Sequence, residues 1–114
     1  MADEKQEPNE TNEAELGGLR EEIDRLDTEI LTLISRRASC AMRVAEVKMQ
    51  ADPQGAVFYR PEREAQVLSR VMQRNGGPLG NEDMARLFRE IMSACLALEK
   101  PLEVAYLGPE GTFT

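Results

Sequence analysis

LREEIDRLDTEILTLISRRASCAMRVAEVK, residues 19–48, is the stretch that decides the fold of this chain. Through this stretch and its N-terminal flank, one row of positions follows alternating steps of three and four residues. Its nonpolar members are Leu16, Leu19, Ile23, Leu26, Ile30, Leu33, Cys40, Val44 and Val47. This spacing indicates a long helix whose apolar seam packs against other helices.

Position 37 of the same row is an arginine. A guanidinium on a packed seam is expected to be buried or nearly so, and burial is tolerated only where an anion meets the charge. The partner of Arg37 is therefore either a carboxylate of the protein, in a structural salt bridge, or an anionic ligand. For one arginine taken alone, the salt bridge is the more common outcome.

Two more basic residues bear on that choice. Arg20 and Lys48 lie four heptads apart on one helix face, and Arg37 adjoins their row. At 1.5 Å per residue they would be about 42 Å apart, so no single ligand touches both from one helix. Either both are solvated charges, as most lysines and arginines are, or two antiparallel helices bring Arg20 of one copy toward Lys48 and Arg37 of the other.

Composition excludes several classes of function. The chain has 114 residues, enough for one small domain, and its lack of histidine rules out histidine acid–base catalysis and histidine metal ligands. Its formal charge of -7 argues against nucleic acid as a partner. Cys40 and Cys95 are predicted to be small buried hydrophobes in a reducing compartment, not a disulfide or a zinc site. Because no secretory segment or membrane span is found, a cytoplasmic protein is expected.

Breaks in the pattern divide the chain into three predicted helices. Residues 1–13 are rich in acids and are expected to be a disordered tail. The first helix is predicted over residues 13–50, with a firm start at Leu19 because two glycines weaken its first turns. ADPQG ends this helix, and residues 51–59 are predicted to form a loop.

The remaining helices are bounded by proline, glycine and asparagine. The second helix is predicted to begin at Pro61 and to stop at the Asn-Gly-Gly of residues 75–77. Asn81 is the predicted N-cap of the third helix, and Pro101 ends it. The wide apolar stripe of this third helix predicts burial on more than one side.

Helix lengths bear on the architecture. The first helix is too long for a compact domain of about 100 residues. The other two helices could lie end to end along one side of it, which would leave the rest of its apolar surface open. A symmetric dimer with paired long helices covers that surface economically, and an extended three-helix monomer is the alternative.

The pattern changes after Pro101. Residues 104–107 alternate weakly, as a strand does, and GPEGTFT follows as a glycine-rich loop. Because a strand without neighbours is not stable, residues 102–114 are interpreted as the truncated start of a second domain.

These segments together resemble a known family. Residues 19–48 resemble the first helix of the all-helical chorismate mutases, YRPEREAQVL (59–68) is similar to the start of their second helix, and FREIMSACLALE (88–99) to their third. VAYLGPEGTFT (104–114) resembles the opening of prephenate dehydratase. The resemblance implies a mutase domain over residues 14–101 of a bifunctional mutase–dehydratase, all-α, with three helices per chain and an intertwined homodimer.

The resemblance also implies a reaction. The family catalyses the Claisen rearrangement of chorismate to prephenate on the route to phenylalanine and tyrosine, without cofactor or metal. It holds a compact substrate conformer and stabilises charge on the ether oxygen, in active sites that the two subunits share. Chorismate is then the expected small-molecule partner. Dehydratase activity is expected to be absent, because nearly all of that domain is missing.

The family's functional residues match positions in this chain. Arg20 corresponds to the arginine that crosses from the neighbouring subunit to a substrate carboxylate, and Arg37 to the arginine that grips a carboxylate within the chain. Lys48 corresponds to the lysine that bonds the ether oxygen and a carboxylate. Arg63 corresponds to a supporting arginine, and Glu64 to the glutamate that accepts from the ring hydroxyl.

Three positions differ from some family members. Arg60 stands where some have an aspartate near the ring hydroxyl, and Cys95 where some have a serine that touches a carboxylate. Glu99 stands where some have a glutamine that donates to the ether oxygen, and it must be protonated to donate. Burial and the helix dipole would raise its pKa and Lys48 would lower it, a balance that the sequence leaves open. With Lys48 and Arg37, Glu99 completes the expected catalytic set.

Two other functions fit parts of the pattern. An isochorismate pyruvate lyase uses the same cationic pocket on the same frame, although the GPEGTF tail argues against it. A helical dimerisation module without catalysis would pair Arg37 with a glutamate of its partner. Such a module would show neither binding of chorismate nor thermal stabilisation by it.

Overall fold

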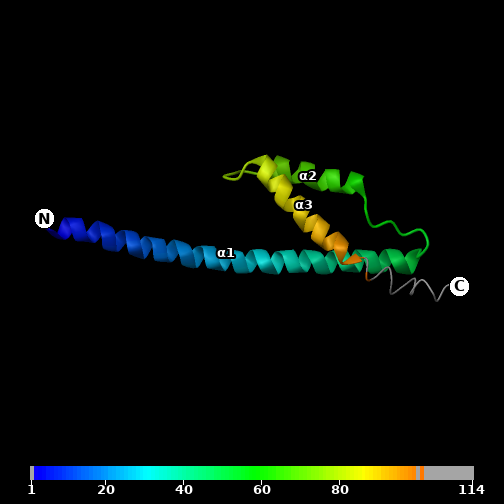
Figure 1. Cartoon of the computed structure of the whole chain (residues 1–114), viewed down its shortest axis with the longest axis horizontal. Coiled ribbons are helices and arrows are strands. Elements are labelled where there is room, and N and C mark those ends of the chain that lie inside the picture. Colours follow the sequence, from blue (N-terminus) through cyan, green and yellow to red (C-terminus); the bar gives the residue numbers. More distant parts are fainter. Residues whose placement is uncertain (1, 100, 102–114) are drawn as a thin grey trace. The chain divides into compact units, whose positions relative to one another are not determined.

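Three helices make up the part of the chain that the computed structural model describes, residues 2–99 and 101 (Figure 1). They are α1 (Ala2–Ala51), α2 (Pro61–Arg74) and α3 (Asn81–Ala97). No strand occurs among these residues, so the predicted all-helical class with one very long helix is confirmed. The strand and loop expected over residues 102–114 lie outside the described residues. The chain divides between Ser35 and Arg36 into two units, and α1 contributes to both.

The start of α1 differs from the prediction. The helix begins at Ala2 instead of near Glu13. Extending a helix that already exists adds one hydrogen bond per residue fixed, which is far cheaper than starting one. Gly17 and Gly18 cost about 1 kcal/mol each relative to alanine, and the helix runs through both.

The predicted seam of α1 is uncovered in the single chain. We call its aliphatic members the α1 apolar row, and their exposed fractions lie between 45% and 59%. They are Leu16, Leu19, Ile23, Leu26, Ile30, Leu33, Val44 and Val47. Cys40, which shares this face, is exposed, so the prediction that both cysteines are buried is wrong for Cys40 and right for Cys95. The face that α1 buries within the chain is a different one.

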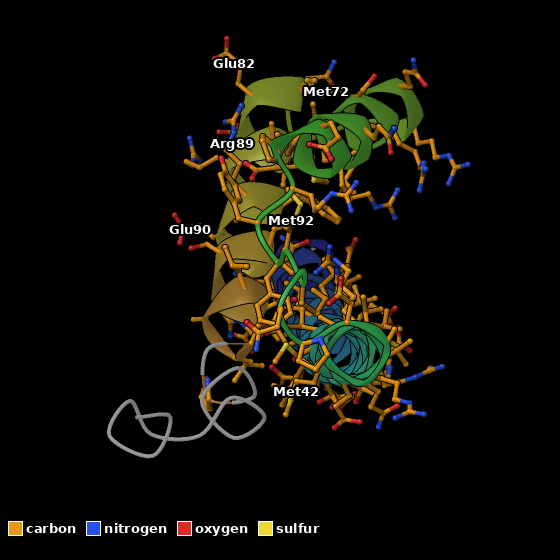
Figure 2. All side chains as sticks on the ribbon, turned by 90° about the vertical axis from the view of Figure 1, so that its right-hand side faces the viewer. Met42, Met72, Glu82, Arg89, Glu90 and Met92 are labelled. Atoms are coloured by element: carbon orange, nitrogen blue, oxygen red, sulfur yellow. The ribbon has the colours of Figure 1, made fainter. Side chains whose placement is uncertain are left out.

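The small core lies in the second unit, after Ser35. Its buried side chains come from all three helices and are all nonpolar: Ala45, Met49, Leu68, Ala85 and Cys95. Helices α2 and α3 pack against each other, whereas an end-to-end arrangement was considered from the sequence. Figure 2 shows Met92 on the inner side of α3 and Glu90 on its outer side.

Local hydrogen bonds explain where α2 and α3 begin. As predicted, α2 starts at Pro61, and the carbonyl of Arg60 accepts the amides of Arg63 and Glu64, each at 3.0 Å. The N-cap of α3 is Gly80, not Asn81 as predicted. The Asn81 side chain is engaged elsewhere, because its Oδ1 accepts from Nδ2 of Asn75 at 2.8 Å.

The end of α2 is confirmed at the predicted stop. Asn75 is its C-cap residue, with extended backbone, and the Asn75 side chain bridges the turn that leads to α3. Its Nδ2 donates to the carbonyl of Leu79 at 2.8 Å, and its Oδ1 accepts the Gly77 amide at 3.1 Å.

Within the described part of the chain, none of the helices is both long enough and apolar enough to cross a membrane.

Candidate active site

One cavity gathers most of the residues that the sequence singled out. It has a volume of about 380 Å³ and lies in the second unit, between the C-terminal part of α1, the start of α2 and the end of α3. Four cations and two acids line it: Arg37, Lys48, Arg60, Arg63, Glu64 and Glu99. The chain as a whole carries a charge of -7, so this cavity is a locally cationic place in an acidic protein.

Arg37 is half-buried at the wall of the cavity and has no carboxylate partner among the described residues. Its Nη1 donates to the sulfur of Cys95 at 3.3 Å. A thiol sulfur is a weak, uncharged acceptor, so this contact orients the guanidinium without neutralising it. Arg37 therefore does not form the structural salt bridge with a protein carboxylate that was one of its two possible partners, at least within the described chain.

Lys48 occupies the last turn of α1 and is also half-buried. Its Nζ donates to the carbonyl oxygen of Val57 at 3.0 Å, which ties the end of α1 to the loop before α2. An ammonium group carries three donors, so this one bond leaves two for other acceptors. The lysine is thereby positioned at the cavity with donor capacity to spare.

The start of α2 brings three further charged side chains to the cavity. The two backbone bonds to the Arg60 carbonyl fix the first turn, from which exposed Arg63 and half-buried Glu64 project. Arg60 itself donates from Nε to Oε1 of Glu62 at 2.7 Å. That hydrogen bond holds the pKa of Glu62 below its usual value.

Glu99, just past the end of α3, is half-buried. Its Oε2 atom is buried and has no hydrogen-bond partner among the described residues. Burial raises the pKa of Glu99, and the nearby charge of Lys48 lowers it by less, so the net direction is upward. The balance that the sequence left open is thus upward, so Glu99 keeps its proton, and with it the capacity to donate a hydrogen bond, to a higher pH than an ordinary glutamate.

Arg20 is not among the residues that line this cavity. It lies in the first unit, on the N-terminal part of α1, where it is exposed. Sequence reasoning also missed the two aromatic residues that line the cavity, Phe58 and Tyr59, in the loop before α2. The sequence did contain a sign of them, because two adjacent aromatic residues are unusual in a chain that is 4% aromatic.

The arrangement suits a small anion with apolar parts. Cationic donors come from two helices and a loop, while Val44, Met92 and Leu96 add nonpolar wall. Half-buried charges interact more strongly than charges in water, since less solvent screens them. A set of fixed donors around a compact space can hold one conformer of such an anion and stabilise charge that develops on it.

The chain is similar to known proteins over most of its length. Residues 19–100 match the family model described as chorismate mutase type II. A bifunctional chorismate mutase/prephenate dehydratase of Stutzerimonas stutzeri is 66% identical over 102 residues, which cover 88% of this chain and 28% of that protein. The chain therefore spans less than a third of the length of this relative.

Two solved structures have the same fold. A form II chorismate mutase from Thermus thermophilus has a TM-score of 0.70 and 34% identity, covering 75% of this chain and 93% of that one. A chorismate mutase from Helicobacter pylori in complex with prephenate has a TM-score of 0.66 and 30% identity, with coverage of 75% and 90%. The chain belongs to the type II chorismate mutase family, as the resemblance of its helices predicted.

Proposed function

We propose that this domain converts chorismate to prephenate. One observation carries the proposal: Arg37 is a half-buried guanidinium without a carboxylate partner in the described chain, and it faces the same cavity as Lys48. Such a charge is stabilised when an anion enters. Chorismate brings two carboxylates, and the relative from Helicobacter pylori was solved with prephenate, the isomer that the reaction forms.

Each lining residue has a role that its chemistry allows. Arg37 holds one substrate carboxylate in a charge-assisted pair, and Arg63 supports the binding of the dianion from the start of α2. Lys48 keeps its bond to Val57 and donates to the ether oxygen with its remaining hydrogens. Glu64, as a carboxylate, accepts from the ring hydroxyl.

Glu99 and Cys95 complete the proposed site. Glu99 in its protonated form donates a second hydrogen bond to the ether oxygen, beside the one from Lys48. The buried atom Oε2 has no partner in the described chain, which leaves it available for the substrate. Cys95 accepts a hydrogen bond from Arg37 and stands at the position where a carboxylate contact is expected.

The chemistry then needs no covalent bond between protein and substrate. Within one molecule the C–O ether bond breaks as a new C–C bond forms, so atoms and electrons balance without a co-reactant. Negative charge gathers on the ether oxygen in the transition state, where Lys48 and protonated Glu99 strengthen their hydrogen bonds. Positioning and preorganised electrostatics therefore supply the rate acceleration.

We infer further that a second copy completes the site with its Arg20. The α1 apolar row is exposed in the single chain, and large contiguous apolar surfaces on soluble proteins generally mark interfaces. An antiparallel pairing of two α1 helices would cover this row and carry Arg20 of one copy to the cavity of the other. A two-fold dimer with two shared sites is the closed form of that pairing.

A direct assay tests the proposed activity. The chain should consume chorismate and release one prephenate for each chorismate, with no added metal or cofactor. Incubation with isochorismate separates the lyase alternative, which would release pyruvate. A folded chain that is neither active on chorismate nor thermally stabilised by it would instead support the dimerisation module.

A further inference from the structure

We propose that Arg60 is an additional substrate-recruiting residue at the cavity, and that Glu62 controls how readily it can engage the substrate. The inference rests on the proposed function and deepens it, because it names a residue that sets how the dianion is captured. Arg60 lines the cavity, and its Nε pairs with Glu62.

The backbone fixes Arg60 in register with the rest of the site. Arg60 is the N-cap residue of α2, and its carbonyl accepts the amides of Arg63 and Glu64 at 3.0 Å. The origin of its side chain is therefore set by the same two bonds that set the first turn of α2. The long, charged side chain of Arg60 therefore begins beside Arg63 and Glu64, the two residues of α2 that are proposed to contact the substrate.

The ion pair between the side chains of Arg60 and Glu62 is weak. The two side chains are 51% and 60% exposed, and an ion pair in water of this kind contributes little to stability. Within the described residues, the pair uses Nε alone and leaves the Nη groups without a hydrogen bond. A substrate carboxylate can therefore engage the free edge of the guanidinium, or displace Glu62 from it.

The positive charge of Arg60 is what would attract the anionic substrate to the cavity. An incoming dianion must approach an acidic chain of charge -7, and cations at the cavity offset that repulsion locally. Arg37 and Lys48 are half-buried, whereas Arg60 is exposed and is met earlier by an approaching anion. Glu62 partly cancels the Arg60 charge, and its lowered pKa keeps it ionised at neutral pH. Capture should thus depend on both residues and on ionic strength.

The test measures kcat and KM for chorismate with the full chain at several ionic strengths. Arg60→Gln should lower kcat/KM by about fivefold at low salt, through KM, and the deficit should shrink as added salt screens the charge. Glu62→Gln should raise kcat/KM by about twofold at low salt, because it frees the guanidinium. In Arg60→Gln, the further change Glu62→Gln should have little added effect.

Arg86→Gln is the matched control. Arg86 forms an exposed pair with Asp83 at 2.9 Å on α3, it does not line the cavity, and its loss changes net charge by the same amount. If Arg60→Gln and Arg86→Gln give superimposable salt profiles, Arg60 has no special part in capture. A fall in kcat at unchanged KM would also overturn the proposal. A wild-type chain without mutase turnover would instead refute the proposed function itself.

Discussion

At the residue scale, Arg37 links the sequence to the site. An arginine at a position that its pattern reserves for a hydrophobe predicted an anionic partner, either a carboxylate of the protein or a ligand, and the guanidinium has no carboxylate partner in the described chain. The contact with Cys95 could not be predicted, because the two residues are 58 positions apart and meet only when α3 packs on α1. The sequence therefore predicted the kind of partner that Arg37 needs, but only the folded structure shows which side chains lie next to it.

Lys48→Ala is expected to impair the chemical step. The variant lacks the donor proposed for the ether oxygen, and loss of one preorganised donor of this kind costs roughly 100- to 1000-fold in kcat. Steady-state kinetics with chorismate measure the change, and circular dichroism checks that the helices persist. A folded Lys48→Ala protein with nearly normal turnover would remove Lys48 from the mechanism.

Glu99 predicts a pH dependence with a definite sign. Burial raises the pKa of Glu99 more than Lys48 lowers it, so the protonated donor persists above the ordinary pKa of a glutamate. As pH rises through the raised value the proton is lost, and kcat/KM should decline. Glu99→Gln donates at every pH and should flatten that decline.

The pH profile has a matched control in Glu90→Gln. Glu90 lies on the outer side of α3, so the same change of side chain there should leave the decline in place (Figure 2). If Glu99→Gln and wild type decline in parallel, the proton that matters is not on Glu99.

At the element scale, a helix-starting proline predicted the start of its helix better than an expected capping residue did. Pro61 begins α2 as predicted, because a proline at the first position loses no helical hydrogen bond. The α3 cap was misplaced by one residue, since Asn81 has a partner across the turn, Asn75, that no local pattern reveals. The packing of α2 on α3 was also missed, because lengths alone do not say which faces of two helices meet.

The inner face of α1 offers a stability test. Met49 is 1% exposed, so Met49→Ala removes buried nonpolar volume and should lower the free energy of unfolding by about 2–5 kcal/mol. Met72→Ala is the matched control on α2, where the side chain is 37% exposed and the loss should be much smaller. Denaturant unfolding at one fixed protein concentration compares the two. Equal losses would show that Met49 is not part of the core.

At the scale of the whole molecule, the sequence predicted a second copy from the length of the first helix. The α1 apolar row is exposed in the single chain, and the second copy stays a prediction. Arg20 could be matched to a family position, but it does not line the cavity of its own chain. A residue that acts across an interface is visible in sequence only through resemblance, because its partner lies on another molecule.

Mixing two inactive variants tests the shared site. Arg20→Ala and Arg37→Ala homodimers should each be weakly active, because every site lacks one arginine. After subunit exchange, about half the dimers are mixed, and each holds one intact site, so activity should recover to about a quarter of wild type. The measurement is chorismate turnover before and after exchange. Absence of any recovery, with exchange verified by mass spectrometry, would place both arginines in the same subunit's site.

The exposed face of α1 also bears on the life of the newly made polypeptide. A chain that has left the ribosome but has not yet met another presents its leucines and isoleucines to water along α1. Such a surface attracts chaperones and proteases, and the fraction of time spent in this condition falls as expression rises. Cellular abundance should therefore feed back on turnover, with scarce copies degraded faster per molecule than plentiful ones.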